Sequence, residues 1–402
     1  MLSNYDRLKG GRCMRNLRGF LWAAVFLILA QILKWLGVTY GDMLFMAYPY
    51  FSRNVMSVLQ IFSSWTSTNV WQLTILLVAV AALVSLALTI VFRRNVLRWL
   101  GTVATVCSVV YFLHMGVYAL GENARPLAQE MKLETVTISQ SDLVEATTYY
   151  RDQANALANR VPRDSDGALR FDDFDILAVQ AADGFESLTL RYSLFSGSTA
   201  PVKKLGFSNL FSQLGISGVT VGLTGEACVN PDIFCGMLPF TMCHEMAHRM
   251  AIVREDDANF AAYLACESNS DLQFQYSGYL NAYIYCINAL WETNPESASR
   301  IQGGVSEALA RDLVDNNQKV RQYENSPARA IGENTNNAYI QAMGDDRGTE
   351  SYDEVYQLLV NWYLVNYDPD RDIEEEPKFD PYNPSEFTGT EVPAPATEPD
   401  DE

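Results

Sequence analysis

Two of the three histidines in this 402-residue chain lie four residues apart with a glutamate between them. They are His244 and His248, in the stretch LPFTMCHEMAHRMAIVREDDANFAAYLAC (238–266), and the glutamate is Glu245. Residues i and i+4 of a helix share one face, so two imidazoles at this spacing can bind one zinc ion at about 2.0–2.1 Å each. Glu245 projects about 100° around the helix, where it reaches a water molecule beside the metal. The pattern predicts one Zn²⁺ per chain and a general base for hydrolysis.

The segment after this helix must supply a third ligand, because a catalytic zinc site has three protein ligands and one open position. No third histidine follows within reach, and carboxylates take its place. Glu255 is the predicted ligand, since its position leaves room for a turn into a second helix. Asp256 and Asp257 compete for the same role. Asn259, one turn further along, is either an acceptor for the Nδ1–H of a ligand histidine or a plain packing residue.

The first 120 residues contain three apolar stretches of the length that crosses a bilayer as a helix, about 20 residues. They predict transmembrane spans at 17–38, 71–92 and 97–120. The first span is predicted to be a retained anchor, because no small-x-small cleavage site follows it. His114, near the outer end of the third span, is expected to be a neutral interfacial histidine without chemistry.

Charge is distributed unevenly between the two parts of the chain. Residues 1–120 carry ten Lys and Arg against two Asp and Glu, and residues 121–402 carry 19 against 46. Basic residues precede the first span and fill the turn at 93–98, whereas the loop at 39–70 has only Arg53. The positive-inside rule therefore predicts a multi-pass protein with a cytoplasmic N-terminus and an extracytoplasmic C-terminal domain. So acidic a domain is a poor match for nucleic acid, and the lipid bilayer is the expected partner.

Residues 121–367 are predicted to form an α+β, mostly helical domain. Alternating β-branched residues and glycines suggest one or two short strands within 215–230. Apolar residues at helical spacing predict helices at 139–161 with Ser141 as N-cap, at 240–252 with Pro239 in the first turn, at 277–291, after Gly304, and at 351–367. The tail, 368–402, is acidic and rich in proline, and we expect it to be disordered.

These motifs resemble known families. HExxH followed by E-x-x-A-N on a second helix resembles the gluzincin metallopeptidases. The stretches LTGEACVN, YSGYLNA, YIQAMGDDRGTESYDEVYQLLVNWY and GDMLFMAYP, together with the zinc motif and the three spans, look like the bacterial domain-of-unknown-function family numbered 3810, over about 17–367. The resemblance implies a protein of the bacterial cell membrane with a zincin-like metallopeptidase fold, and it leaves the substrate open.

Further residues have candidate roles at such a site. The segment TGEACVN (224–230) is predicted to be an edge strand that holds an extended peptide by strand addition. Glu226 within it would bind a substrate amine or a ligand histidine, or would simply be exposed to solvent. Tyr276 and Tyr279 are candidate donors to the oxyanion, with packing as the alternative role.

Seven cysteines remain to be placed. Cys228 and Cys235 flank a short loop of the outer domain, where an oxidising compartment would allow a disulfide, although two free buried thiols fit equally well. Cys243 adjoins His244 but points elsewhere on the helix, so it is not counted as a ligand.

Taken together, the sequence predicts a membrane-anchored zinc metallopeptidase that hydrolyses a peptide or protein substrate. Two alternatives stay open. One is a non-catalytic sensor whose outer domain binds zinc, and the other is a structural membrane protein with a closed zinc site. The presence of Glu245 weighs against the sensor.

Overall fold

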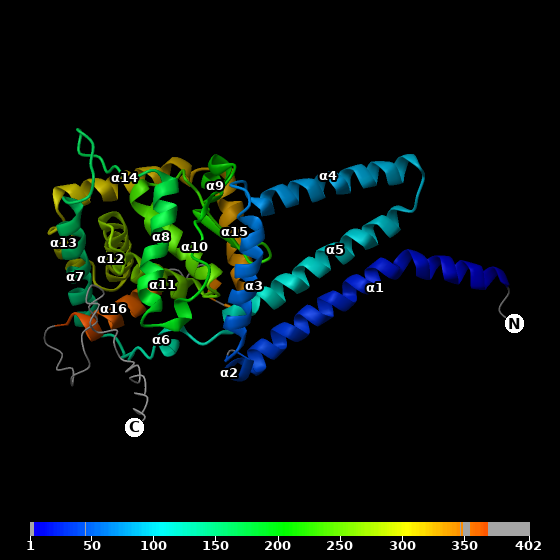
Figure 1. Ribbon diagram of the computed structural model, residues 1–402, viewed down its shortest axis with the longest axis horizontal. Coiled ribbons are helices and arrows are strands. Elements are labelled where there is room, and N and C mark those ends of the chain that lie inside the picture. The colour runs from blue at the N-terminus through cyan, green and yellow to red at the C-terminus, as the bar shows by residue number, and fades with distance from the viewer. Residues whose placement is uncertain (1–3, 45, 346, 349–353, 369–402) are drawn as a thin grey trace, which may run out of the picture.

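Three long helices extend from one side of a helical domain (Figure 1). The computed structural model describes residues 4–44, 46–345, 347–348 and 354–368. Within this part of the chain, three helices are long and apolar enough to cross a membrane, at Asn16–Thr39, Val70–Val91 and Val96–Val117. Their apolar side chains are mostly exposed, which suits a lipid surrounding and not water. These features agree with membrane anchoring through three helices.

The first and third of these helices pack closely against each other. They are α1 (Asn4–Thr39) and α5 (Val96–Val117). The second of the three helices is α4 (Val70–Val91). A Cβ on Gly19 would lie 2.4 Å from the backbone carbon of Gly101, so only glycine allows this approach. Thr105 donates a hydrogen bond to the Gly19 carbonyl at 2.8 Å. The third span was predicted to reach residue 120, but the helix ends at Val117 because a 3₁₀ turn, η1 (Ala119–Asn123), redirects the chain into the domain.

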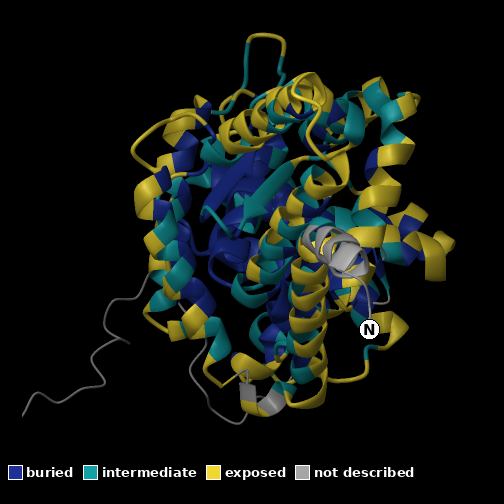
Figure 2. Cartoon of the chain, turned by 90° about the vertical axis from the view of Figure 1, so that its right-hand side faces the viewer, coloured by how far each residue is buried: buried dark blue, intermediate teal, exposed yellow. Residues whose placement is uncertain are grey.

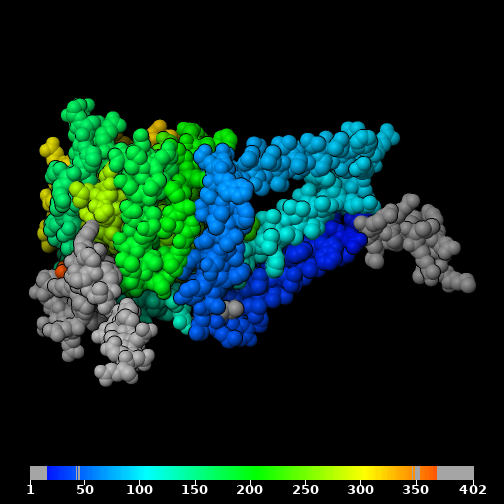
Figure 3. Space-filling model, viewed as in Figure 1, coloured from blue at the N-terminus to red at the C-terminus, as the bar shows by residue number. Residues whose placement is uncertain are grey.

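Two short helices join the first and second spans. They are α2 (Gly41–Leu44) and α3 (Tyr48–Ser63). In Figures 1 and 3, α3 runs across the ends of the long helices, between them and the domain. Arg53 on its buried face donates to the carbonyl of Met250 at 3.2 Å. This helix therefore connects the spans to the segment that follows the HExxH helix.

Helices make up most of the domain. It begins with α6 (Leu127–Glu130), and the remaining elements are α7 (Gln140–Ala158), α8 (Phe174–Thr189), η2 (Ser193–Phe195), α9 (Ser208–Leu214), η3 (Cys235–Met237), α10 (Leu238–Arg249), α11 (Glu255–Glu267), α12 (Leu272–Thr293), α13 (Pro295–Gln302), α14 (Glu307–Glu324), α15 (Pro327–Met343) and α16 (Val355–Asn366). Residues 351–353 of the predicted last helix, and residues 369–402 of the predicted tail, lie outside the described residues.

The N-cap predicted for α7 was wrong. The cap is Ser139 and not Ser141, because Asp142 completes a capping box with Ser139. The Ser139 amide donates to the Asp142 carboxylate at 2.7 Å, and the Asp142 amide donates back to the Ser139 hydroxyl at 3.2 Å. Ser141 lies within the first turn of the helix.

Three short strands form the sheet, in the order β1-β3-β2. β1 (Lys203–Lys204) is parallel to β3 (Glu226–Val229), and β2 (Gly218–Val221) is antiparallel to β3, with Gly218 opposite Val229. The prediction that TGEACVN forms an edge strand was therefore wrong. β3 is paired on both sides, and β2 is the edge strand that lies beside α10.

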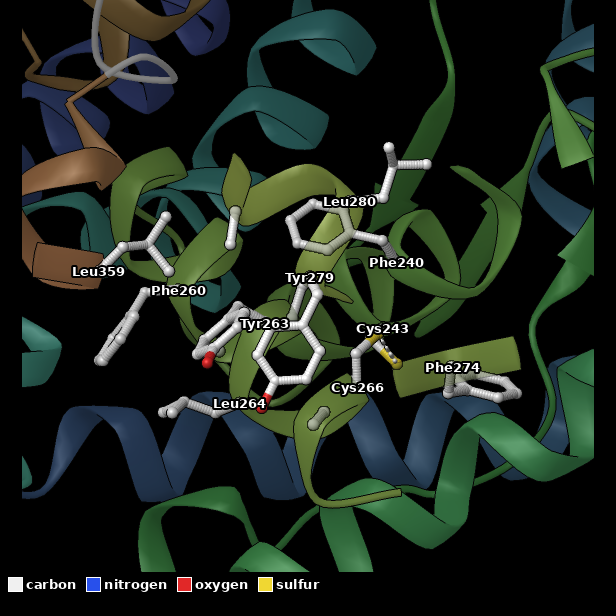
Figure 4. Close-up of a cluster of buried hydrophobic side chains, with 14 of the residues drawn as sticks. Phe240, Cys243, Phe260, Tyr263, Leu264, Cys266, Phe274, Tyr279, Leu280 and Leu359 are labelled. Atoms are coloured by element: carbon white, nitrogen blue, oxygen red, sulfur yellow. Dashed lines mark hydrogen bonds between the residues drawn. The ribbon is translucent and has the colours of Figure 1, made fainter. Parts of the chain in front are cut away.

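The interior of the domain is formed by α10, α11 and α12. Figure 2 shows buried residues gathered behind an outer layer of helices with exposed faces. In the core, Cys243 of α10 and Cys266 of α11 lie with their sulfur atoms 3.8 Å apart, near Tyr263 and Tyr279 (Figure 4). A Cβ on Gly184 of α8 would lie 2.0 Å from a backbone oxygen of α11. These contacts hold α8 and α10 against α11, and α10 and α11 carry the HExxH and E-x-x-A-N motifs.

Candidate metal centre

His244 and His248 lie one turn apart on α10, a helix that is buried along almost its whole length. Their Nε2 atoms face each other at 3.0 Å. α10 was predicted to continue to residue 252, but it ends at Arg249, and Ala251 adopts a left-handed φ of 67°. This early turn brings the Ile252 carbonyl to 2.9 Å from Nδ1 of His248. That contact orients the ring so that Nε2 is left to bind a metal.

Glu255, the first residue of α11, closes the group. Its Oε2 lies 3.3 Å from Nε2 of His244 and 3.4 Å from Nε2 of His248. The two competing carboxylates are directed elsewhere. Asp256 pairs with Arg254 and Arg347, and Asp257 pairs with Arg254. Of the three carboxylates that the sequence left open, the structure brings only Glu255 to the histidines.

The spacing of these three atoms fits a zinc ion. Ligand atoms about 2.0–2.1 Å from a tetrahedral zinc lie about 3.3–3.4 Å from one another. The observed separations among the two nitrogens and the oxygen are 3.0, 3.3 and 3.4 Å. Two imidazoles and one carboxylate also form a ligand set that leaves one position of a tetrahedral zinc open. His244, His248 and Glu255 could therefore hold one Zn²⁺.

Electrostatics within the cluster favour a cation. Burial works against charge on His248, but the Glu255 carboxylate outweighs it and raises the pKa of His248 to about 9. Burial alone would raise the pKa of Glu255, and the two imidazoles instead hold that pKa well below its usual range. The group stabilises a positive charge between its members, and a metal ion would replace the proton in that position.

Glu245, the residue after His244 on α10, lies against the edge strand. The Thr220 hydroxyl of β2 lies 2.6 Å from the Glu245 carboxylate and 2.9 Å from the Glu245 carbonyl oxygen. A Cβ on Gly218 would lie 2.3 Å from the same carboxylate, so a glycine is required there. Burial raises the pKa of Glu245 above its usual value. The strand thus fixes the carboxylate while leaving it a better proton acceptor than an exposed one.

A cavity of about 310 Å³ opens beside His244, one of the three candidate ligands. His244 and Asn259 both line it, so Asn259 lies close to the site. The acceptor role that we predicted for Asn259 is filled at His248 by the Ile252 carbonyl. Apolar groups and a few polar groups share the remaining wall, including Phe234, Phe240, Asn281, Tyr285 and Lys319.

Tyr276 and Tyr279 do not belong to this site. The Tyr276 hydroxyl donates to the buried carboxylate of Asp312. The Tyr279 hydroxyl donates to the buried carboxylate of Glu267 at 3.1 Å. Both tyrosines face the domain interior, and both fill the packing role that the sequence left as their alternative.

Glu226 is buried, and its carboxylate is bound by α4 and Lys203. Its carboxylate accepts hydrogen bonds from the amides of Val70 and Trp71, at 2.8 and 2.9 Å, and from the Lys203 ammonium at 2.7 Å. The side chain is fully buried. Glu226 therefore caps the N-terminus of the second span and ties that span to the sheet.

The disulfide between Cys228 and Cys235 is absent, and both thiols are free. Cys228 lies in the central strand with its sulfur 3.3 Å from the side-chain oxygen of Asn69. Cys235 begins η3 with its sulfur 3.5 Å from the Leu169 carbonyl. The two side chains have separate partners, which corresponds to the free-thiol alternative.

Sequence reasoning missed one residue of this site, Tyr118. Its ring packs edge-on against His248, with centroids 6.3 Å apart. Burial, with contributions from Tyr339, Glu255 and Glu245, raises the pKa of Tyr118 well above its usual value. The only signal in the sequence was the nearby His114, which had been assigned no chemistry.

The fold and the candidate site define a largely helical protein with three membrane-type helices and a cluster of three residues that could hold a metal ion. The chain belongs to the family described as protein of unknown function (DUF3810), which matches residues 48–360. This range includes the cluster, α4 and α5, and leaves out α1. No curated protein and no solved structure matches the chain. The function must therefore be inferred from the geometry of the site.

Proposed function

We propose that this protein is a membrane-anchored zinc metallopeptidase with a zincin-like domain. The main support is the convergence of His244, His248 and Glu255 at the spacing of zinc ligands. Glu245, on the same helix, adds a buried carboxylate beside an edge strand. Three protein ligands, an open fourth position and an adjacent carboxylate base are the arrangement that zinc hydrolases use.

The residues have separate tasks in this reaction. A bound zinc ion lowers the pKa of water and polarises a carbonyl group. Glu245 accepts a proton from the attacking water and delivers it to the leaving amine. Thr220 holds the Glu245 carboxylate in place throughout. The edge strand β2 would pair with an extended peptide, and the cavity beside His244 would take one of its side chains.

The same proposal includes an orientation in the membrane. The basic residues before α1 and in the turn at 93–98 favour the cytoplasmic side, which places the domain outside the cytoplasm. A C-terminal fusion to a phosphatase that is active only outside the cytoplasm should then be active. An inactive phosphatase on a stably expressed fusion would reverse the proposed orientation.

Zinc content and cleavage, measured together, test the function. Elemental analysis of the purified full-length protein should find one zinc per chain. Glu255→Gln should weaken zinc binding, whereas Glu245→Gln should keep the zinc and abolish cleavage of a peptide library. Glu186→Gln, at an exposed position of α8, is the matched control and should behave like wild type.

Two other results would reject the proposal. Full zinc occupancy without cleavage by the wild type would favour the non-catalytic sensor or the structural protein. A wild-type protein that binds no zinc would remove the metal centre itself.

A further inference from the structure

The proposed reaction lacks one component, a donor to the oxygen of the scissile carbonyl. Negative charge develops on this oxygen in the transition state, and a fixed hydrogen-bond donor stabilises it. The two tyrosines predicted for this task face Asp312 and Glu267. The donor must therefore come from another element that reaches the ligand cluster.

Tyr118 meets the geometric requirement. It directly follows α5, the third membrane-type helix, and its ring lies against His248. The side chain is 6% exposed, and the carboxylates of Glu245 and Glu255 both act electrostatically on its hydroxyl. Within the described part of the chain, the Tyr118 hydroxyl makes no hydrogen bond. A hydroxyl without a partner in this part of the protein is available to a bound substrate.

Neighbouring elements hold the Tyr118 ring in place. Met56, Ala251 and Val253 form a small apolar cluster with it. On another side, a Cβ on Gly222, in the turn between β2 and β3, would lie 2.7 Å from Cβ of Tyr118. The residue thus contacts α3, the turn of the hairpin and the segment after α10, and it has little freedom to move away from the metal ligands.

His114 and Tyr339 extend this arrangement away from the metal ligands. The ring of His114, in the last turn of α5, lies 5.7 Å from that of Tyr118 and 6.0 Å from that of Tyr339 on α15. Nε2 of His114 and the Tyr339 hydroxyl are hydrogen-bonded at 3.1 Å. All three histidines of the chain therefore belong to one contiguous group of side chains, which Tyr118 connects.

We propose that Tyr118 is a catalytic residue that donates a hydrogen bond to the scissile carbonyl oxygen, and that His114 and Tyr339 are positioning residues that hold it. This assignment rests on the proposed function. Water attacks the carbonyl carbon and gives its proton to Glu245, while the π electrons of the C=O bond move to the oxygen. Tyr118 stabilises that oxygen and keeps its own proton. The site is then built from both parts of the chain, and the membrane helix supplies part of the chemistry.

The variant Tyr118→Phe tests the assignment, because it removes the hydroxyl and keeps the ring. In the full-length protein, kcat should fall about 10²- to 10³-fold, the usual effect of losing one oxyanion donor, with KM little changed. Zinc content should stay at the wild-type value. Affinity for a phosphinic peptide, whose tetrahedral phosphorus group mimics the transition state, should fall about 10- to 100-fold by calorimetry. Tyr111→Phe, in α5, is the matched control and should leave all these values unchanged.

The positioning residues need a different readout. His114→Leu should lower kcat and leave KM and zinc content unchanged. His114→Gln, which can still bond to the Tyr339 hydroxyl, should recover much of the loss. Equal losses in the two variants would show that His114 only fills space and would overturn its positioning role.

The results separate this assignment from the proposed function. A wild type that cleaves peptides, together with a Tyr118→Phe variant of equal kcat and equal phosphinic-peptide affinity, would overturn the role of Tyr118 alone. Loss of zinc from Tyr118→Phe would also overturn it, because the hydroxyl would then be supporting the metal ligands and not the transition state. A wild type that holds zinc but cleaves nothing would reject the proposed function and, with it, this assignment.

Discussion

Removal of the Glu226 carboxylate should weaken the connection between the membrane helices and the domain. In Glu226→Ala, the amides of Val70 and Trp71 at the start of α4 lose their acceptor. Lys203 loses its ionic partner and keeps only the carbonyls of Ser63 and Thr68. The variant therefore leaves a cation without its counter-charge, and two helix amides without their acceptor, at a buried position.

The expected effect is large because the pair is buried. The Glu226 side chain is 0% exposed and that of Lys203 is 13% exposed. Removing one partner of a buried ion pair costs roughly 3–5 kcal/mol, and lost helix capping is part of that cost. This corresponds to a decrease in Tm of roughly 5–15 °C. Replacing both residues, as in Glu226→Leu with Lys203→Met, should cost less than Glu226→Ala alone, because no unpaired charge remains.

Two measurements on the purified protein in detergent check this reasoning. Thermal unfolding gives the Tm, and hydrogen exchange reports protection of the amides of Val70 and Trp71. Both should decrease in Glu226→Ala, whereas Glu186→Ala, at an exposed position, should match wild type. Unchanged exchange at Val70 and Trp71 would refute the capping role, even if the Tm fell for another reason.

Three further predictions follow from the packing and the charges. Gly184→Ala should destabilise the protein by roughly 1–3 kcal/mol in thermal unfolding, because the new Cβ meets the backbone oxygen of Ala265 at 2.0 Å. This clash outweighs the better helix propensity of alanine, which is worth about 1 kcal/mol. Equal stability of the variant and the wild type would show that α8 and α11 can separate freely. Burial, and then nearby carboxylates, raises the pKa of Glu122 to about 7, so the free energy of unfolding falls as pH rises from the usual pKa of a glutamate to this value. Glu122→Gln should accordingly gain about 1–2 kcal/mol at pH 8 and almost nothing at pH 4, and a gain at pH 4 alone would contradict the sign. A reducing agent should leave the Tm unchanged, because Cys228 and Cys235 are free thiols, and a lower Tm would indicate a disulfide.

Membership of the family extends the functional question to other chains. The matched range begins within α3 and includes two membrane-type helices as well as the ligand cluster. A role for Tyr118 in the site gives these two parts a physical reason to occur together. The zinc and cleavage measurements on this chain would therefore address the function of a family described only as unknown.

Short-range patterns in the sequence were enough to identify several features. The three membrane-type helices follow from the length and composition of single stretches, and the shared face of His244 and His248 follows from the period of one helix. Glu255 was the favoured third ligand because the HExxH motif and the next helix are close in sequence. These inferences need no knowledge of the rest of the chain.

Long-range contacts decided the remaining features. Glu226 meets α4 across more than 150 residues, and Tyr118 meets His248 across 130 residues, so neither partnership leaves a periodic signal. The pairing of β3 on both sides made β2 the edge strand, because β1 joins the sheet from a distant part of the chain. Sequence by itself determined which residues can bind zinc and which segments can cross a membrane. Only the tertiary structure decided that a membrane-type helix ends at the candidate metal ligands, because packing between distant elements fixes that contact.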